Sequence, residues 1–85
     1  MVRFEFHDLE NIDGYFSGVI YINTDKERYI LEFGYDIEFK KLKLLNSTNI
    51  IYNSNCVSYD YEKLAEIKED YGAWIIREIE YRLNG

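Results

Sequence analysis

The feature that most constrains the fold is an alternation of side-chain character between residues 29 and 39. Apolar or aromatic side chains occupy six consecutive odd positions: Tyr29, Leu31, Phe33, Tyr35, Ile37 and Phe39. Successive side chains of a β-strand point to opposite faces, so a strand would place all of them on one face. Residues 34–36 contain the only turn chemistry within the run, and a single strand of this length would be unusually long. We therefore predict a hairpin with strands at about 28–34 and 37–45 and its turn near residues 34–36.

The second of these predicted strands changes parity along its length. The apolar residues up to Phe39 are odd, whereas the next two, Leu42 and Leu44, are even. One extra residue at Lys40–Lys41, a β-bulge, would return both sets to the same face of the sheet. The sequence thus predicts a bulge at this point.

An earlier hairpin is expected at the N-terminus. Val2, Phe4 and Phe6 alternate with charged residues, which predicts a strand at about 2–8. Turn-forming Asn, Asp and Gly occur within residues 9–14, and residues 15–23 are rich in β-branched and aromatic side chains typical of a second strand. After a further turn at residues 46–49, a short strand or edge segment is predicted at about 50–57.

From Ser58 or Asp60 onward the apolar period changes to that of a helix. The apolar stripe consists of Leu64, Ile67, Tyr71, Ile75 and Ile79, flanked by Trp74 and Leu83. Ser58 or Asp60 can cap the start, and Asn84-Gly85 suits the end of a helix at about 60–83. Antiparallel strands with one apolar face need a cover. The predicted fold is therefore α+β: an antiparallel sheet of about four or five strands, made of two successive hairpins plus a short strand, covered on one face by a single C-terminal amphipathic helix.

Length and composition agree with one small globular domain over residues 1–85. The chain has 85 residues, 47% hydrophobic and 31% charged, which is too apolar for disorder. Cys56 is the only cysteine, so no internal disulfide framework can form. The N-terminus alternates in polarity and lacks a signal peptide's long apolar run, and no segment is apolar enough to span a membrane. We expect a cytoplasmic location.

Catalytic and metal chemistry is not expected. His7 is the only histidine and would have to serve any histidine-dependent triad, while a zinc site could gather only His7 and Cys56. Residues 8–14 are rich in acids, but an EF-hand alignment on Gly14 places Leu9 and Ile20 at ligand positions. This segment is more simply a solvated acidic turn, His7 a surface residue and Cys56 a small buried one. We predict no enzyme, no cofactor and no metal.

Acidic charge is the main indication of function. Sixteen Asp and Glu against ten Lys and Arg give a net charge of -6, and nine tyrosines accompany them. Acids dominate the two hairpins, and Glu62, Glu66 and Asp70 recur every four residues on the helix, where like charges repel by a few tenths of a kcal/mol. Helix-dipole complementarity is the alternative reason for acids in the first half of a helix. The candidate partner-binding residues are Glu5, Asp8, Glu10, Asp13, Tyr15, Tyr21, Glu32, Asp36, Glu38, Glu62, Glu66, Glu69, Asp70 and Tyr81.

The positive charge has one concentration, at Lys40, Lys41 and Lys43. A nucleic-acid site needs a wider basic footprint with interleaved aromatic residues, and the negative net charge repels phosphate. Direct nucleic-acid binding is therefore not expected. Lysines along a strand more often prevent aggregation between sheet edges.

These properties favour a binding protein with a basic protein partner. Carboxylates would stand in for phosphates and tyrosines for stacked bases, so that the chain acts as an inhibitor or decoy of a nucleic-acid-processing protein. In size, acidity and aromatic content it is similar to phage-encoded anti-CRISPR proteins and to the immunity partners of nuclease toxins, a similarity that rests on no sequence motif. The alternative is a structural or assembly module that forms a homodimer or docks on a larger complex.

Overall fold

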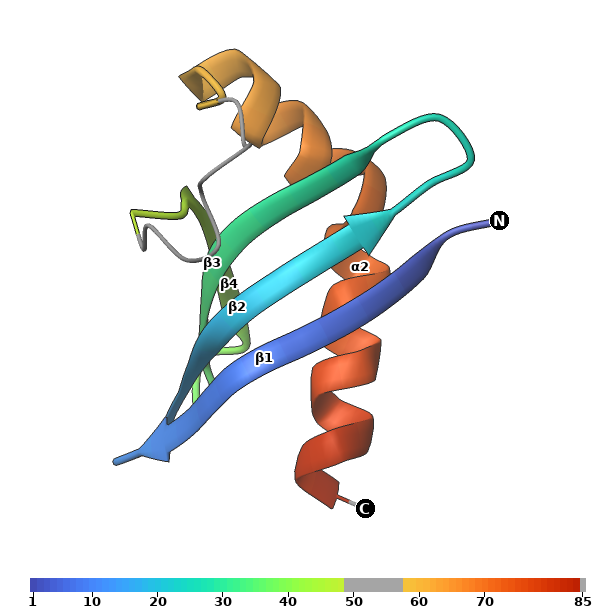
Figure 1. Ribbon diagram of the computed structural model, residues 1–85. Helices are drawn as coiled ribbons and strands as arrows, with labels where there is room; N and C mark the ends of the chain where they lie inside the picture. Colours follow the sequence, from blue (N-terminus) through green and yellow to red (C-terminus); the bar gives the residue numbers. More distant parts are fainter. Residues whose placement is uncertain (49–57, 85) are drawn as a thin grey trace.

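The computed structural model describes residues 1–48 and 58–84. Its strands are β1 (Arg3–Ile12), β2 (Tyr15–Asn23), β3 (Arg28–Asp36) and β4 (Lys41–Asn46), and helix α2 (Tyr61–Asn84) follows. The strands form one antiparallel sheet whose spatial order is also their order in the chain, with α2 across one face (Figure 1). The predicted α+β architecture is confirmed. The short strand expected at about 50–57 lies outside the described residues.

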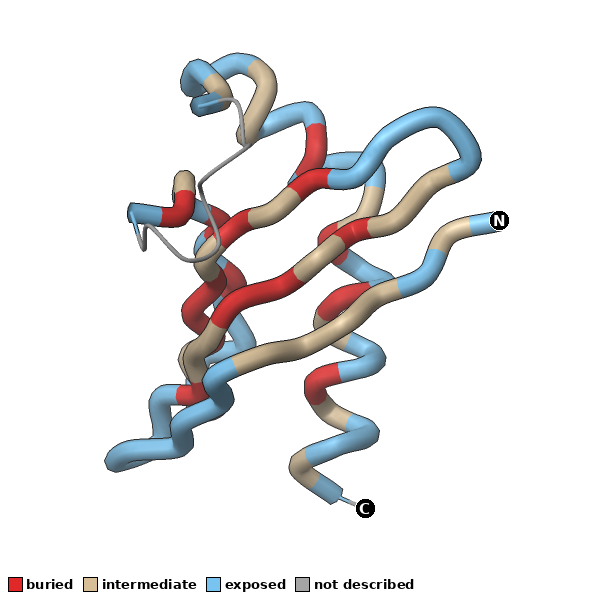
Figure 2. Tube along the Cα trace, in the orientation of Figure 1, coloured by how far each residue is buried: buried red, intermediate tan, exposed pale blue. Residues whose placement is uncertain are grey.

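The hydrophobic core fills the space between the sheet and α2. Alternate residues of the strands point toward the helix, as the sequence periodicity predicts, and the helix contributes its apolar stripe. Buried residues are concentrated on β2, β3, β4 and the inner side of α2 (Figure 2). The core cluster consists of Phe16, Ile20, Ile22, Tyr29, Leu31, Phe33, Tyr35, Leu42, Leu44, Ile67, Ile75 and Ile79. The other face of the sheet, which points away from α2, is called the outer sheet face below.

A two-residue turn joins β1 to β2. Asp13 and Gly14 have φ angles of 51° and 80°, and the flanking residues Ile12 and Tyr15 are paired. Two consecutive positive φ angles give the turn type whose twist matches that of antiparallel strands, and Asp-Gly is a favoured sequence for it. The turn chemistry read from the sequence is thus concentrated in these two residues.

Strand β1 runs past its predicted end near residue 8 because it contains a β-bulge. Paired residues shift register between His7 and Glu10, so Asp8 and Leu9 together oppose Gly18, and Asp8 has a φ of 52°. The backbones approach closely here: a Cβ on Gly18 would lie 2.7 Å from the His7 carbonyl oxygen. The bulge changes the parity of the strand. Glu10 consequently shares the outer sheet face with residues that precede the bulge at odd positions.

The prediction of a turn near residues 34–36 is wrong, because β3 continues through Gly34 to Asp36. Gly34 is buried and pairs with Ser17 and Lys43 inside the sheet. The hydroxyl of Tyr15 lies 1.8 Å from the position that a Cβ of Gly34 would take, so the ring covers this glycine. An aromatic side chain that shields a glycine in a sheet stabilises extended backbone there.

The true turn between β3 and β4 comprises residues 37–40. The Phe39 N–H donates to Asp36 Oδ1 at 3.0 Å, and Lys40 closes the turn with a φ of 55°. The pairing of β3 with β4 then runs without a register shift from Asp36–Lys41 to Leu31–Asn46. The predicted bulge at Lys40–Lys41 is therefore wrong. The change of parity arises because Ile37 and Phe39 belong to the turn.

Helix α2 begins where the sequence indicates. The Lys63 N–H donates to Asp60 Oδ1 at 2.8 Å, which identifies Asp60 as the capping residue. The approach to the helix is fixed by Asn46, whose side-chain amide donates to the Tyr59 carbonyl at 2.7 Å and accepts from the Tyr59 N–H at 2.9 Å. These contacts attach the start of α2 to the end of β4.

Candidate functional site

The predicted partner-binding residues divide between two surfaces that the core separates. On the outer sheet face lie Glu5, Glu10, Tyr15, Tyr21, Glu32 and Asp36. On the exposed side of α2 lie Glu62, Glu66, Glu69, Asp70 and Tyr81. Asp8 is in the β1 bulge, Asp13 in the first turn and Glu38 in the β3–β4 turn. The structure does not bring the whole set onto one face.

Carboxylates of the outer sheet face are used to hold the fold together. Glu5 Oε2 accepts from the Asn23 side-chain amide at 2.6 Å. Glu32 Oε2 accepts from the Thr48 N–H at 2.7 Å and from its hydroxyl at 3.3 Å. Asp36 is bonded within the β3–β4 turn. Since their lone pairs are partly occupied, these groups are less free to meet a partner's cations.

The tyrosines of the outer sheet face also have structural roles. The Tyr21 ring lies 4.5 Å from the His7 ring, centroid to centroid, and 5.4 Å from the Arg28 guanidinium carbon. His7, expected at the surface, is half-buried on this face, with Nε2 4.0 Å from Glu5 Oε1. Tyr15 covers Gly34. Neither tyrosine is therefore a free platform for stacking.

The first half of α2 carries the most accessible of the predicted carboxylates. Glu62, Glu66, Glu69 and Asp70, here called the acidic helix face, are all exposed and span about 12 Å along the axis at 1.5 Å per residue. Lys63 Nζ donates to Glu66 Oε1 at 3.3 Å and forms an ion pair with it. The other three make no hydrogen bond or ion pair with residues 1–48 or 58–84. This surface concentrates negative charge, and among those residues Lys63 alone forms an ion pair with it.

The hydroxyl groups of two core tyrosines donate hydrogen bonds to carboxylates. The Tyr35 hydroxyl donates to Glu80 Oε2 at 3.1 Å, which ties β3 to α2, and the Tyr29 hydroxyl donates to Glu27. Burial, then the bond to Glu80, raises the pKa of Tyr35. For Tyr29 the bond to Glu27 is the larger cause and burial the smaller, and Lys63 opposes both. The prediction that these tyrosines belong to the core is confirmed.

These pKa values predict a loss of stability in alkali. Tyr29 and Tyr35 keep their protons in the folded chain beyond the ordinary value of 10.0, so their contribution is complete below that pH and is lost as pH rises through the raised pKa. The pKa of Lys63 is also raised, first by its hydrogen bond with Glu66 and then by that with Tyr29. Loss of the Lys63 proton at high pH therefore lowers the stability further. Urea unfolding from neutral pH to about pH 12 should show this fall. The fall in the free energy of unfolding with pH should be shallower in Tyr35→Phe and unchanged in Tyr81→Phe. An equal slope in the original chain and both variants would contradict the role given to Tyr35.

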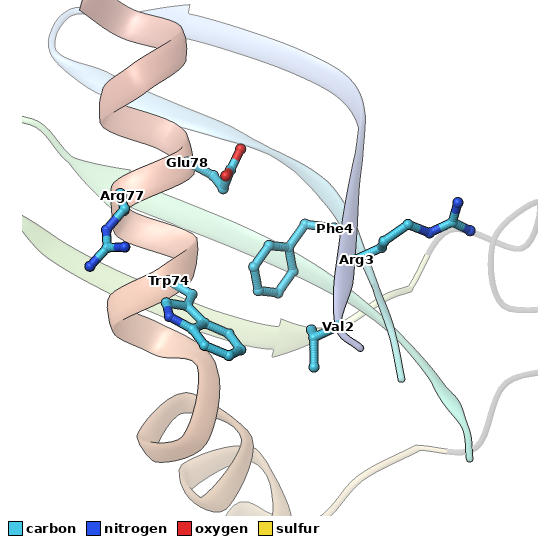
Figure 3. A pocket seen from close by; sticks show the side chains of 6 residues that line it. All are labelled: Val2, Arg3, Phe4, Trp74, Arg77 and Glu78. Atoms are coloured by element: carbon cyan, nitrogen blue, oxygen red, sulfur yellow. The ribbon is translucent and has the colours of Figure 1, made fainter. Parts of the chain in front are cut away.

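A groove lies between the sheet edge at β1 and α2. Its volume is about 400 Å³ and it is lined by Val2, Arg3, Phe4, Trp74, Arg77 and Glu78. Figure 3 shows Phe4 directed toward the helix, the Trp74 ring facing Val2, and Arg3 directed away. The groove combines an apolar floor with charges of both signs, and no single ligand chemistry follows from it.

Some exposed aromatic residues were not among the predicted site residues. Tyr61 is 92% exposed at the start of α2, directly before Glu62 in the chain, and Trp74 is 49% exposed although it adjoins the apolar stripe. For Tyr61, its position directly after the capping Asp60 was an available signal, because the first helical turn often points to solvent. For Trp74 no such signal exists, since its exposure depends on how far the sheet edge reaches over the helix.

Neither a metal site nor a membrane-spanning helix is found among the described residues, and comparison of the chain with known proteins found no match. Residues 1–48 and 58–84 contain no cluster of three or more His, Cys, Asp or Glu side chains suited to a metal ion. No helix in these two segments has the length and apolar character needed to cross a membrane. No protein-family model matches the chain. Comparison with curated proteins and with solved structures likewise found no match.

Proposed function

We propose that this chain is a non-enzymatic, cytoplasmic acidic binding protein that inhibits a basic nucleic-acid-processing protein by occupying its nucleic-acid site. The observation that supports the proposal is the acidic helix face, with Glu62, Glu69 and Asp70 exposed and unpaired with any described residue. Like charges at this spacing oppose helix formation, and the favourable dipole interaction falls off within the first turn. Asp70 lies beyond that turn, so the dipole does not account for it.

A basic nucleic-acid groove is the partner chemistry that such a surface fits. Negative potential steers a cationic protein toward the face, and carboxylates on successive helical turns offer it a line of charges as a phosphate backbone does. Tyr61, which precedes Glu62 in the chain, is exposed and could add an aromatic contact at the start of the helix. The decoy would then compete with nucleic acid and would lose affinity as salt increases.

The test uses the intact protein as bait for nucleic-acid-processing proteins in a bacterial lysate. We expect a captured protein to be released by duplex DNA and by added salt. The triple variant Glu62→Gln, Glu66→Gln, Asp70→Asn should bind it roughly tenfold more weakly or worse, at up to about 1 kcal/mol for each exposed charge.

The matched control removes the same charge from the turns and from β1. Glu10→Gln, Asp13→Asn and Glu38→Gln together change the net charge equally and leave α2 intact. We expect the affinity of this variant for the captured protein to stay within a factor of about three of that of the original chain, since the effect of distant charges is screened by salt. Equal losses in both variants, or capture that neither DNA nor salt reverses, would contradict the decoy.

The alternative, an assembly module, is favoured by the outer edge of β1, with which no other described strand pairs (Figure 1). Two copies of β1 paired antiparallel about Phe4 would place Arg3 opposite Glu5 of the second copy, twice, and Val2 opposite Phe6. Trp74 lies beside this edge. Sedimentation across concentration separates the two functions: a dimer weakened by Arg3→Glu and restored by adding Glu5→Arg favours assembly, whereas a monomer favours the decoy.

A further inference from the structure

A second groove, between β4 and α2, has the opposite charge from the rest of the molecule. Its volume is about 680 Å³ and four lysines line it, Lys40, Lys41 and Lys43 from the end of the turn and β4, and Lys68 from α2. The net charge of the chain is -6, so this gathering of cations runs against its overall composition. It is called the lysine groove below.

The lysine groove runs along the edge of β4 that faces away from β3. Four consecutive residues, 40–43, line it, although alternate side chains of a strand point to opposite faces. A groove that contacts both sets therefore lies at the side of the strand. Within residues 1–48 and 58–84, β4 is paired with β3 alone, so no described strand pairs with the backbone groups on its other side, where a strand can add.

The floor of the lysine groove is apolar and is kept low by a glycine within the helix. It consists of Leu42, Gly72, Ala73 and Ile76. Glycine lowers helix stability relative to alanine. A Cβ at Gly72 would lie 3.5 Å from Lys68 Cγ and 3.9 Å from Leu42 Cδ2, which are ordinary contact distances. The internal packing therefore does not require glycine here, and the absence of a side chain at this position leaves the floor of the groove open.

The charges decide which kind of strand can occupy this edge. A second copy of β4 would bring Lys41 and Lys43 close to lysines of the same kind, and like charges across a strand pair are destabilising. An acidic segment gains from the same lysines. A nucleic acid is a poorer fit, because none of the described side chains that line the groove is aromatic and could stack on a base.

We propose that the lysine groove binds an acidic peptide segment of a partner protein, in extended conformation, which adds as a strand to the edge of β4 that faces away from β3. Its backbone pairs with β4, its carboxylates meet Lys41, Lys43 and Lys68, and its apolar side chains rest on Leu42 and Ile76. This site is separate from the acidic helix face, so each surface can be tested while the other remains intact.

The experiment selects random displayed peptides on the immobilised full chain and measures the selected peptides, labelled with a fluorophore, by anisotropy. We expect acidic sequences that alternate with apolar residues. Binding should weaken about tenfold in the double variant Lys41→Gln, Lys68→Gln, from two exposed charge contacts. Gly72→Leu, which fills the groove, should weaken it comparably without removing a charge, and its far-ultraviolet circular dichroism shows whether it is folded.

A matched control, Lys26→Gln with Arg77→Gln, removes the same charge outside the groove and should leave binding within about twofold. Bound peptide should also slow hydrogen exchange of amides in β4. Three results would overturn the proposal: no enrichment of acidic peptides, equal losses in the control and groove variants, or β4 amides that exchange at the same rate with peptide bound. Tighter binding of oligodeoxythymidine than of the peptides, at the same lysines, would overturn it in favour of nucleic acid.

Discussion

Replacing Leu31 by alanine is expected to lower the free energy of unfolding by about 2–5 kcal/mol. Leu31 is fully buried in β3, which has a strand on each side, and it pairs with Ile20 beneath α2. Truncation leaves a cavity that the surrounding strands and helix can close only in part. A chain of this length is stable by only about 4–13 kcal/mol, so this one change removes a large share. Urea unfolding followed by far-ultraviolet circular dichroism measures the loss.

Leu45→Ala is the matched control, because it makes the same chemical change in β4 on the outer sheet face. Leu45 is 53% exposed and lies opposite Glu32. Its truncation should alter the free energy of unfolding by no more than about 0.5 kcal/mol. Similar losses for Leu31→Ala and Leu45→Ala would mean that the side of the sheet covered by α2 has been assigned incorrectly.

Replacing Gly18 by alanine is expected to lower the free energy of unfolding by about 1–3 kcal/mol, because the added methyl group overpacks the β1 bulge. The new Cβ would lie 2.7 Å from the carbonyl oxygen of His7 and 3.2 Å from that of Asp8. Both are backbone atoms, so relief requires β1 to move away from β2. Chemical denaturation measures the loss, and amide exchange of Asn11 and Ile12 should accelerate because they follow the bulge.

Gly72→Ala provides the contrast for this substitution. It inserts the same methyl group into α2 at ordinary contact distances and removes the entropic cost of a helical glycine. The free energy of unfolding should rise by about 0.5–1 kcal/mol. A stabilised Gly18→Ala variant would show that the close approach of β1 to β2 at the bulge is not present in solution.

The sequence predicted the layers of the fold but not every point where the chain turns. Periodicity located the strands and the helix, and Asp60 was correctly proposed as one of two candidate caps. The turn after β3 was misplaced because Gly34 is a common turn former, and only the Tyr15 ring from a neighbouring strand explains why it stays extended. The β1 bulge was missed because Asp8 takes a left-handed conformation against a glycine ten residues away.

The sequence indicates which residues are candidates for binding a partner, but not which of them share a surface. The spacing of Glu62, Glu66 and Asp70 on a helix fixed their common face. Glu10, by contrast, reaches the outer sheet face only because of the bulge, and Glu32 is occupied by Thr48, which no local pattern indicates. Lys68 joins the β4 lysines through tertiary packing alone. Charge along the chain was therefore known in advance, while its arrangement in space depended on register.

The agreement between strand order in space and in sequence also bears on how the chain reaches this structure. Turns of two to four residues join the neighbouring strands, at residues 13–14, 24–27 and 37–40. Closing such short loops costs little entropy, and folds dominated by local contacts form quickly. The sheet can therefore assemble hairpin by hairpin as the polypeptide leaves the ribosome. Its apolar face stays uncovered until α2, which follows the strands in the chain, emerges and docks against it.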